Sequence, residues 1–119
     1  MVFYQPPWYA KVLSWNEIEE KYLNLGKEFF PFYELVKHIQ QSDASKRLFA
    51  YTYMHKLVIS IYEEIDPLLE TLHIEYDWQN EKWFFSYYAN PFKDPEFERT
   101  YPKEKGIEKF DSFLKKIRW

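Results

Sequence analysis

The sequence predicts an α+β fold, in which an antiparallel sheet of about four strands (two hairpins) packs against two N-terminal helices and one C-terminal helix. Apolar residues recur at helical spacing toward both ends of the chain, and they alternate with polar residues over Leu72–Tyr88. Between these regions, Arg47–Tyr62 is dense in β-branched and aromatic residues. The length of 119 residues predicts a single domain over residues 1–119.

The first two helices are predicted from their start signals and their apolar stripes. Ser14 and Glu17 have the spacing of a capping box, so the first helix should begin just after Ser14. A second helix is expected from Pro31, a residue favoured in the first turn, to about Gln41. The stripes expected to face the core are Trp15, Ile18, Tyr22 and Leu25 in the first helix, and Phe32, Leu35, Val36 and Ile39 in the second.

Two interpretations are open for Arg47–Tyr62. As strands, its apolar residues alternate on both sides of a turn near Met54 and His55. As a helix, a stripe would run from Met54 through Leu57 and Ile61. The β-branched and aromatic content favours a strand hairpin, although neither Gly nor Asn marks the turn.

Leu72–Tyr88 predicts the second hairpin, with its turn centred on Asn80 and Glu81. This register places three pairs on the apolar face, expected to be core: Trp78 with Trp83, Tyr76 with Phe85 and Ile74 with Tyr87. It places three further pairs on the second face: His73 with Tyr88, Glu75 with Ser86 and Asp77 with Phe84.

The remaining segments are predicted to be two connections and a final helix. Glu63–Thr71 is expected to be a connector or a short helical turn. Asn90–Pro102 holds three prolines, which exclude a continuous helix or inner strand, so we expect a loop there. The final helix should bury a stripe that comprises Ile107, Phe110, Phe113, Leu114 and Ile117.

Composition argues against several classes of function. Without cysteine there are no disulfides, thiolate zinc sites or cysteine nucleophiles. With two glycines, Gly26 and Gly106, the chain lacks the phosphate-binding loops of P-loop and dinucleotide-binding proteins. A net charge of −3 disfavours nucleic acid, and no apolar run reaches the ~18 residues of a membrane span. We therefore expect a cytoplasmic protein that binds neither nucleic acid nor membrane, and we predict no cofactor, metal site or catalytic residue.

The outlying property is an aromatic content of 23%. Burying every ring would use roughly a third of the surface that a chain of this size can bury. Some rings should therefore lie at the surface, where Tyr and Trp are typical of protein interfaces.

The candidate binding surface is the second face of the Leu72–Tyr88 hairpin together with the proline-rich loop. Large rings occupy positions where a solvated strand face, the simpler interpretation, would carry small or charged side chains. Either a helix or the proline-rich loop, which follows the strand directly, covers these rings, or they form an exposed aromatic patch beside acidic groups. The candidate residues are His73, Glu75, Asp77, Phe84, Tyr88, Phe92, Phe97 and Tyr101.

The sequence thus predicts a small, cytoplasmic, non-enzymatic protein-binding module with a role such as neutralising or regulating its partner. That partner is another protein or a second copy of the chain. The alternative is a small-molecule-binding or hydrolytic protein with an aromatic-lined pocket between sheet and helices.

Overall fold

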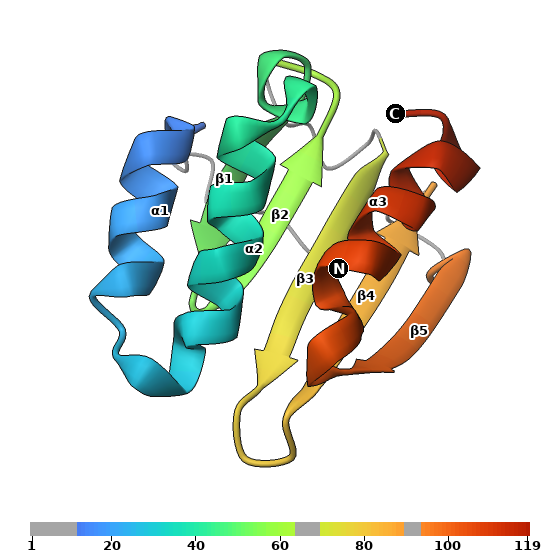
Figure 1. Ribbon diagram of the computed structural model, residues 1–119. Helices are drawn as coiled ribbons and strands as arrows, with labels where there is room; N and C mark the ends of the chain where they lie inside the picture. The colour runs from blue at the N-terminus through green and yellow to red at the C-terminus, as the bar shows by residue number, and fades with distance from the viewer. Residues whose placement is uncertain (1–11, 64–69, 90–93) are drawn as a thin grey trace, which may run out of the picture.

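A computed structural model describes residues 12–63, 70–89 and 94–119 of the chain. In this part the chain forms one five-stranded antiparallel sheet with strand order β1-β2-β3-β4-β5, and its three α-helices lie on one face (Figure 1). The strands are β1 Phe49–Tyr53, β2 Lys56–Ser60, β3 Thr71–Asp77, β4 Lys82–Tyr88 and β5 Phe97–Pro102. The helices are α1 Trp15–Leu23, α2 Phe30–Gln41 and α3 Gly106–Ile117, with short 3-10 segments η1 Lys27–Phe29, η2 Asp43–Lys46 and η3 Lys103–Lys105. The predicted α+β class is confirmed, with one strand more than expected.

The two N-terminal helices form as their local signals predict. The Ser14 Oγ accepts the Glu17 N–H at 3.1 Å, and the Glu17 carboxylate accepts the Ser14 backbone N–H at 3.4 Å, so the capping box is confirmed. Helix α2 begins with proline in its first turn. All four residues of its predicted stripe are buried: Phe32, Leu35, Val36 and Ile39.

The strand interpretation of Arg47–Tyr62 is confirmed by β1 and β2, which pair antiparallel from Phe49–Ser60 to Tyr53–Lys56. Two residues, Met54 and His55, connect them. Met54 has a positive φ of 57°, a left-handed conformation that glycine and asparagine adopt most easily. The backbone therefore makes the tight turn without either residue.

The predicted register of the β3–β4 hairpin is wrong by two residues. Tyr76 pairs with Trp83, and the other apolar pairs shift in the same way: Ile74 with Phe85 and Leu72 with Tyr87. The connection contains four residues because Asp77 Oδ1 accepts the backbone N–H groups of Gln79 and Asn80, at 3.0 and 3.2 Å. A shift of two keeps each residue on its predicted face, but it moves Trp78 out of the strand and leaves it 47% exposed.

The loop expected over Asn90–Pro102 is corrected in its second half, where Phe97–Pro102 forms β5 beside β4. Pro102 ends this edge strand, a place where its missing N–H costs little. In α3 the buried residues include Phe110, Phe113 and Leu114, whereas Ile107 of the predicted stripe is 38% exposed. Residues 90–93 of that loop, and most of the connector predicted over Glu63–Thr71, lie outside the described residues.

Aromatic contacts join the helices to the sheet. Tyr22 of α1 stacks on Phe32 of α2, with ring centroids 4.1 Å apart. Phe32 meets Trp83 of β4 edge-on at 5.1 Å, and Trp83 meets Phe85 at 6.2 Å. Phe85 in turn contacts Phe113 of α3 at 6.3 Å. The surplus rings are thus a large part of what holds both groups of helices to one sheet. None of the helices described is both long enough and apolar enough to cross a membrane.

Candidate binding surface

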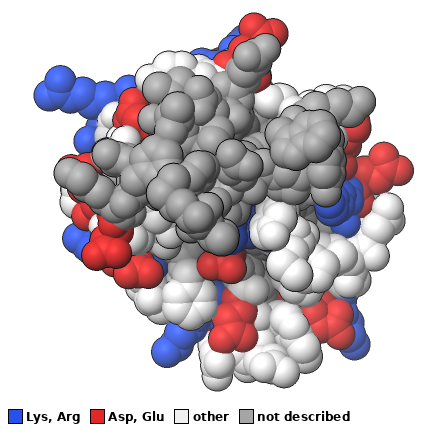
Figure 2. Space-filling view, turned by 180° about the vertical axis from the view of Figure 1, so that it is seen from behind, with Lys and Arg blue, Asp and Glu red and all other residues white. Residues whose placement is uncertain are grey.

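The second face of the sheet, opposite the helices, is partly buried and partly open. His73 in β3 is only 7% exposed, and Val58 in β2 is fully buried. Glu75 and Phe84, which pair across β3 and β4, are both exposed. Figure 2 shows this face, with uncharged, acidic and some basic side chains next to one another in its lower half. Solvent therefore reaches this face toward the β3–β4 turn.

His73 is a neutral, packed histidine. Burial, and then the nearby charge of Lys56, lower the pKa of its imidazole to about 3. The Lys56 Nζ lies 3.4 Å from Nδ1, and because an ammonium can only donate, Nδ1 accepts. The proton then sits on Nε2, 3.2 Å from the Thr71 hydroxyl. With the Tyr88 ring 4.7 Å away, this side chain is part of the packing and is not exposed for binding.

Asp77 organises the β3–β4 turn. Besides the two backbone N–H groups, it accepts the Asn80 side-chain amide at 2.7 Å. This hydrogen bond is the main reason that the pKa of its carboxyl lies below the ordinary value. Asp77 therefore carries a negative charge at neutral pH, at the tip of the hairpin.

The two described aromatic residues of the proline-rich segment lie on the opposite face from the rest of the predicted surface. Phe97 pairs with Tyr87 in the sheet and contacts Phe113 of α3 at 6.1 Å. Tyr101 contacts Phe85 at 5.3 Å. They face the helices because β5 extends the sheet at its edge instead of folding over it.

The eight predicted residues therefore do not form one surface. The structure brings together Glu75, Phe84 and Asp77 on the open part of the second face, with Tyr88 half-buried beside His73. Phe92 lies outside the described residues.

A cavity between the tips of the two hairpins was not predicted. It has a volume of about 520 Å³, and we refer to it as the hairpin-tip notch. The β1–β2 turn forms one side and the end of β3 the other, with η1 behind them. Its lining residues are Phe29, Tyr53, Met54, His55, Lys56, Glu75, Tyr76, Asp77 and Trp78.

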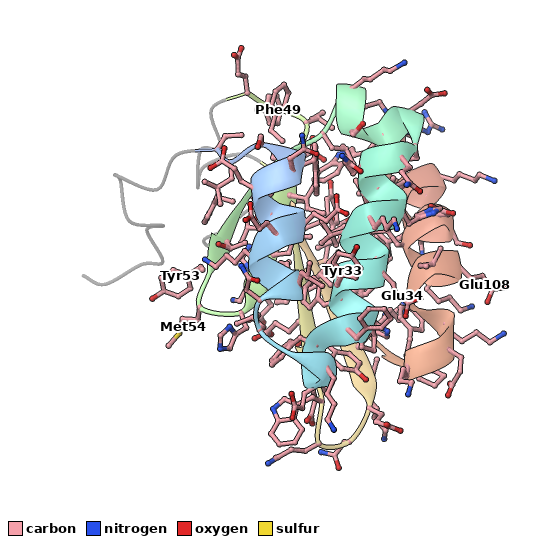
Figure 3. The ribbon with its side chains drawn as sticks, turned by 60° about the vertical axis from the view of Figure 1, so that its left-hand side comes forward. Tyr33, Glu34, Phe49, Tyr53, Met54 and Glu108 are labelled. Atoms are coloured by element: carbon pink, nitrogen blue, oxygen red, sulfur yellow. The ribbon has the colours of Figure 1, made fainter. Side chains whose placement is uncertain are left out.

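Exposed apolar side chains surround this notch. Met54 is 78% exposed, Trp78 47% and Tyr53 37%. Figure 3 shows Tyr53 and Met54 projecting away from the helices at the β1–β2 turn. Three of the large exposed apolar side chains thus gather around one concave feature.

The wall formed by β3 is acidic. Glu75 and Asp77 both line the notch. Burial raises the pKa of the Tyr76 hydroxyl, and the charges of Glu81, Glu104 and Asp77 raise it further. Several carboxylates therefore act on the same end of the hairpin.

Two sequence signals could have identified the notch. The first is the turn at Met54 and His55, which lacks both glycine and asparagine. The second is Trp78, which the four-residue loop places outside the strand. Neither signal shows that the two turns lie side by side, because that depends on the β2–β3 pairing.

Among the described residues, no group of three or more His, Asp or Glu side chains is placed to hold a metal ion. Comparisons with protein-family models, curated proteins and solved structures find no match to this chain.

Proposed function

We propose that this protein binds another protein through the hairpin-tip notch, and that it neutralises or regulates this partner in the cytoplasm. The observation that carries the proposal is Met54. It has a left-handed backbone conformation, its side chain is 78% exposed, and it lines the same cavity as Trp78.

Met54 is unfavourable for folding on two counts. A left-handed residue with a side chain costs roughly 1–2 kcal/mol, which glycine would avoid. Exposing a long apolar side chain at a turn tip brings no burial in return. Residues held in such conformations are concentrated at functional sites, so a binding role explains why methionine is present here.

The residue types around the notch fit a protein interface. Tyr, Trp and Met are enriched at the centres of such interfaces, and Trp and Tyr dominate their binding energy. The flexible thioether of Met54 can adapt to a partner surface. Glu75 and Asp77 would form a polar rim that favours a basic partner and speeds the encounter.

The alternative, a small-molecule site, is supported by the cavity volume, which lies within the range of ligand pockets. Such sites bury about 70–90% of a ligand. Here the walls are the β1–β2 turn and the end of β3, and the side chains of Met54 and Trp78 at their tips are exposed, so a small ligand would remain largely in water. This geometry favours a large partner that covers both turns at once.

The test begins with capture of a partner. The immobilised full chain is incubated with native lysate, a stoichiometric partner is identified by mass spectrometry, and the complex is rebuilt from purified proteins. The Kd is then measured for the wild type, for Trp78→Ser and for Leu23→Ser. Leu23 is a matched control, since it is 51% exposed at the end of α1 but does not line the notch.

We expect Trp78→Ser to weaken binding by about 30-fold or more, the size of an interface hot spot, and Leu23→Ser to change it by less than about twofold. Equal Kd values for Trp78→Ser and the wild type would refute the proposal that the partner binds at the hairpin-tip notch. Recovery of no stoichiometric partner, with no self-association by light scattering at two concentrations, would refute a protein-binding role. If binding is lost in Phe84→Ser but not in Trp78→Ser, the interface is the open second face of the sheet and not the notch.

A further inference from the structure

We infer that the hairpin-tip notch receives an arginine side chain of the partner protein. This inference rests on the proposed function and specifies the chemistry of the partner. It combines three observations: an exposed carboxylate on the wall formed by β3, exposed aromatic and thioether side chains around the same notch, and nearby cations that contact other groups.

Glu75 supplies the carboxylate. It is exposed on β3, lines the notch, and makes no hydrogen bond or ion pair within the described part of the chain. Asp77 already accepts three hydrogen bonds from its own turn. Asp77 therefore contributes negative charge, while both oxygens of Glu75 can accept the paired N–H groups of a guanidinium.

Trp78 supplies an exposed ring on which a planar cation can stack, and Met54 supplies an exposed thioether that lines the same notch. A guanidinium over an indole or phenol ring is attracted to the ring's negative face, and Arg is less strongly hydrated than Lys. Arginine can pair bidentately with Glu75 and also lie against a ring, whereas the ammonium of lysine cannot match both geometries. The notch thus favours arginine over lysine.

The chain's own nearby cations are directed to other groups. The Lys56 Nζ lies 3.4 Å from the His73 ring, and the Lys103 Nζ lies 3.5 Å from Glu81. Lys82 lies opposite Asp77 in the strand register, and its charge helps to lower the pKa of the Asp77 carboxyl. His55, on the β1–β2 turn, has its ring 5.1 Å from that of Phe29. None of these four groups is shown in contact with the Glu75 carboxylate, so an external cation is the group that fits there.

The experiment uses the ¹⁵N-labelled full chain titrated with acetyl-arginine amide at low salt. The readout is the indole N–H resonance of Trp78, assigned with Trp78→Phe. Acetyl-citrulline amide, which has nearly the same shape but no charge, is the matched ligand control. Glu75→Gln is the test variant, and Glu98→Gln, an exposed glutamate on β5 that does not line the notch, is the matched protein control.

We expect a saturable shift of the Trp78 indole with arginine and none with citrulline. Glu75→Gln should weaken the interaction by about fivefold, and Glu98→Gln by less than about twofold. An equal shift with citrulline, an unchanged affinity in Glu75→Gln, or no shift with arginine would each overturn the inference.

The partner measurements separate this inference from the proposed function. If the arginine ligand does not bind but Trp78→Ser still abolishes partner binding, the inference fails and the protein-binding role stands. If the ligand binds but Trp78→Ser leaves the partner's Kd unchanged, the notch is not the partner interface and the proposed function fails.

Discussion

Trp83 and Gly106 are in such close contact that a side chain on residue 106 would collide with the indole. A Cβ added at Gly106 would lie 2.5 Å from Trp83 Nε1. The same Nε1 donates a hydrogen bond to the Lys103 carbonyl at 3.0 Å, just before α3 begins. Trp83, which is 1% exposed, therefore fixes the position at which α3 starts over the sheet.

We predict that Gly106→Ala destabilises the protein. Gly106 is the first residue of α3, so alanine gains at most the ~1 kcal/mol by which it is better than glycine inside a helix, but forcing atoms into a packed contact costs about 1–3 kcal/mol. Because the nearest atoms belong to a rigid, buried ring, we expect a net loss of about 1–2 kcal/mol in the free energy of unfolding. Urea denaturation measures this change. Ser112→Ala, at an exposed position of the same helix, is the control and should be neutral or slightly stabilising.

A second prediction concerns the capping box of α1. Ser14→Ala removes the oxygen that accepts the Glu17 N–H, and we expect a loss of about 1 kcal/mol in the free energy of unfolding. Ser14→Asp keeps an acceptor and should retain most of this stability. Thermal unfolding of the two variants checks the prediction, which fails if they are equally stable.

The local elements could be predicted because their signals are local. The Ser14–Glu17 pair caps a helix wherever it occurs before an apolar stripe. The α2 stripe was identified completely because a spacing of 3.6 residues requires no knowledge of neighbours. The β1–β2 hairpin followed from residue type and alternation alone.

The register and the fifth strand depend on information that hydrophobic alternation does not contain. A slip of two residues leaves each side chain on its face, so the pattern of Leu72–Tyr88 fits both pairings equally. Asp77 decides between them by closing a four-residue loop. Similarly, the prolines of Asn90–Pro102 exclude an inner strand but allow an edge strand. The sequence does not indicate that one edge of β4 is left unpaired by β3 and can accept a fifth strand.

The candidate site was predicted only in part for the same reason. Glu75 and Phe84 were placed on the second face, and the two-residue slip preserved that placement. Phe97 and Tyr101 moved to the helix-covered face once β5 joined the sheet. The notch brings together Met54 and Trp78, and only the pairing of β2 with β3 makes them neighbours.

His73 should make folding sensitive to acid. Its folded-state pKa of about 3 lies below the ordinary 6.5, so at intermediate pH the unfolded chain binds a proton that the folded chain does not. Stability from this group is fully present above pH 6.5 and is lost as pH falls toward 3. The expected loss is about 1.4 kcal/mol per pH unit within this window.

Urea denaturation at several pH values between 4 and 7 tests this prediction, with His73→Gln as the comparison. The variant lacks the titrating group, so its stability should fall less steeply with acid, even if it is less stable at pH 7. Parallel pH profiles for the two proteins would show that His73 is not the source of the sensitivity.

The last prediction links stability to binding at Met54. Asparagine tolerates a left-handed backbone better than methionine, so Met54→Asn should raise the free energy of unfolding by about 0.5–1 kcal/mol. The same change removes an exposed apolar side chain from the notch, and partner binding should weaken by about tenfold. Urea denaturation and titration of the rebuilt complex measure the two effects.

Glu81 provides the matched control, because it also has a left-handed backbone, with φ of 53°, but does not line the notch. Glu81→Asn should give a similar gain in stability, since its ion pair with Lys103 is exposed and contributes little. Binding should then change by less than about twofold. If both variants stabilise the fold and only Met54→Asn impairs binding, methionine at this turn is retained for binding at the expense of stability. If Met54→Asn stabilises the protein and binds as the wild type does, the left-handed methionine has no role in recognition.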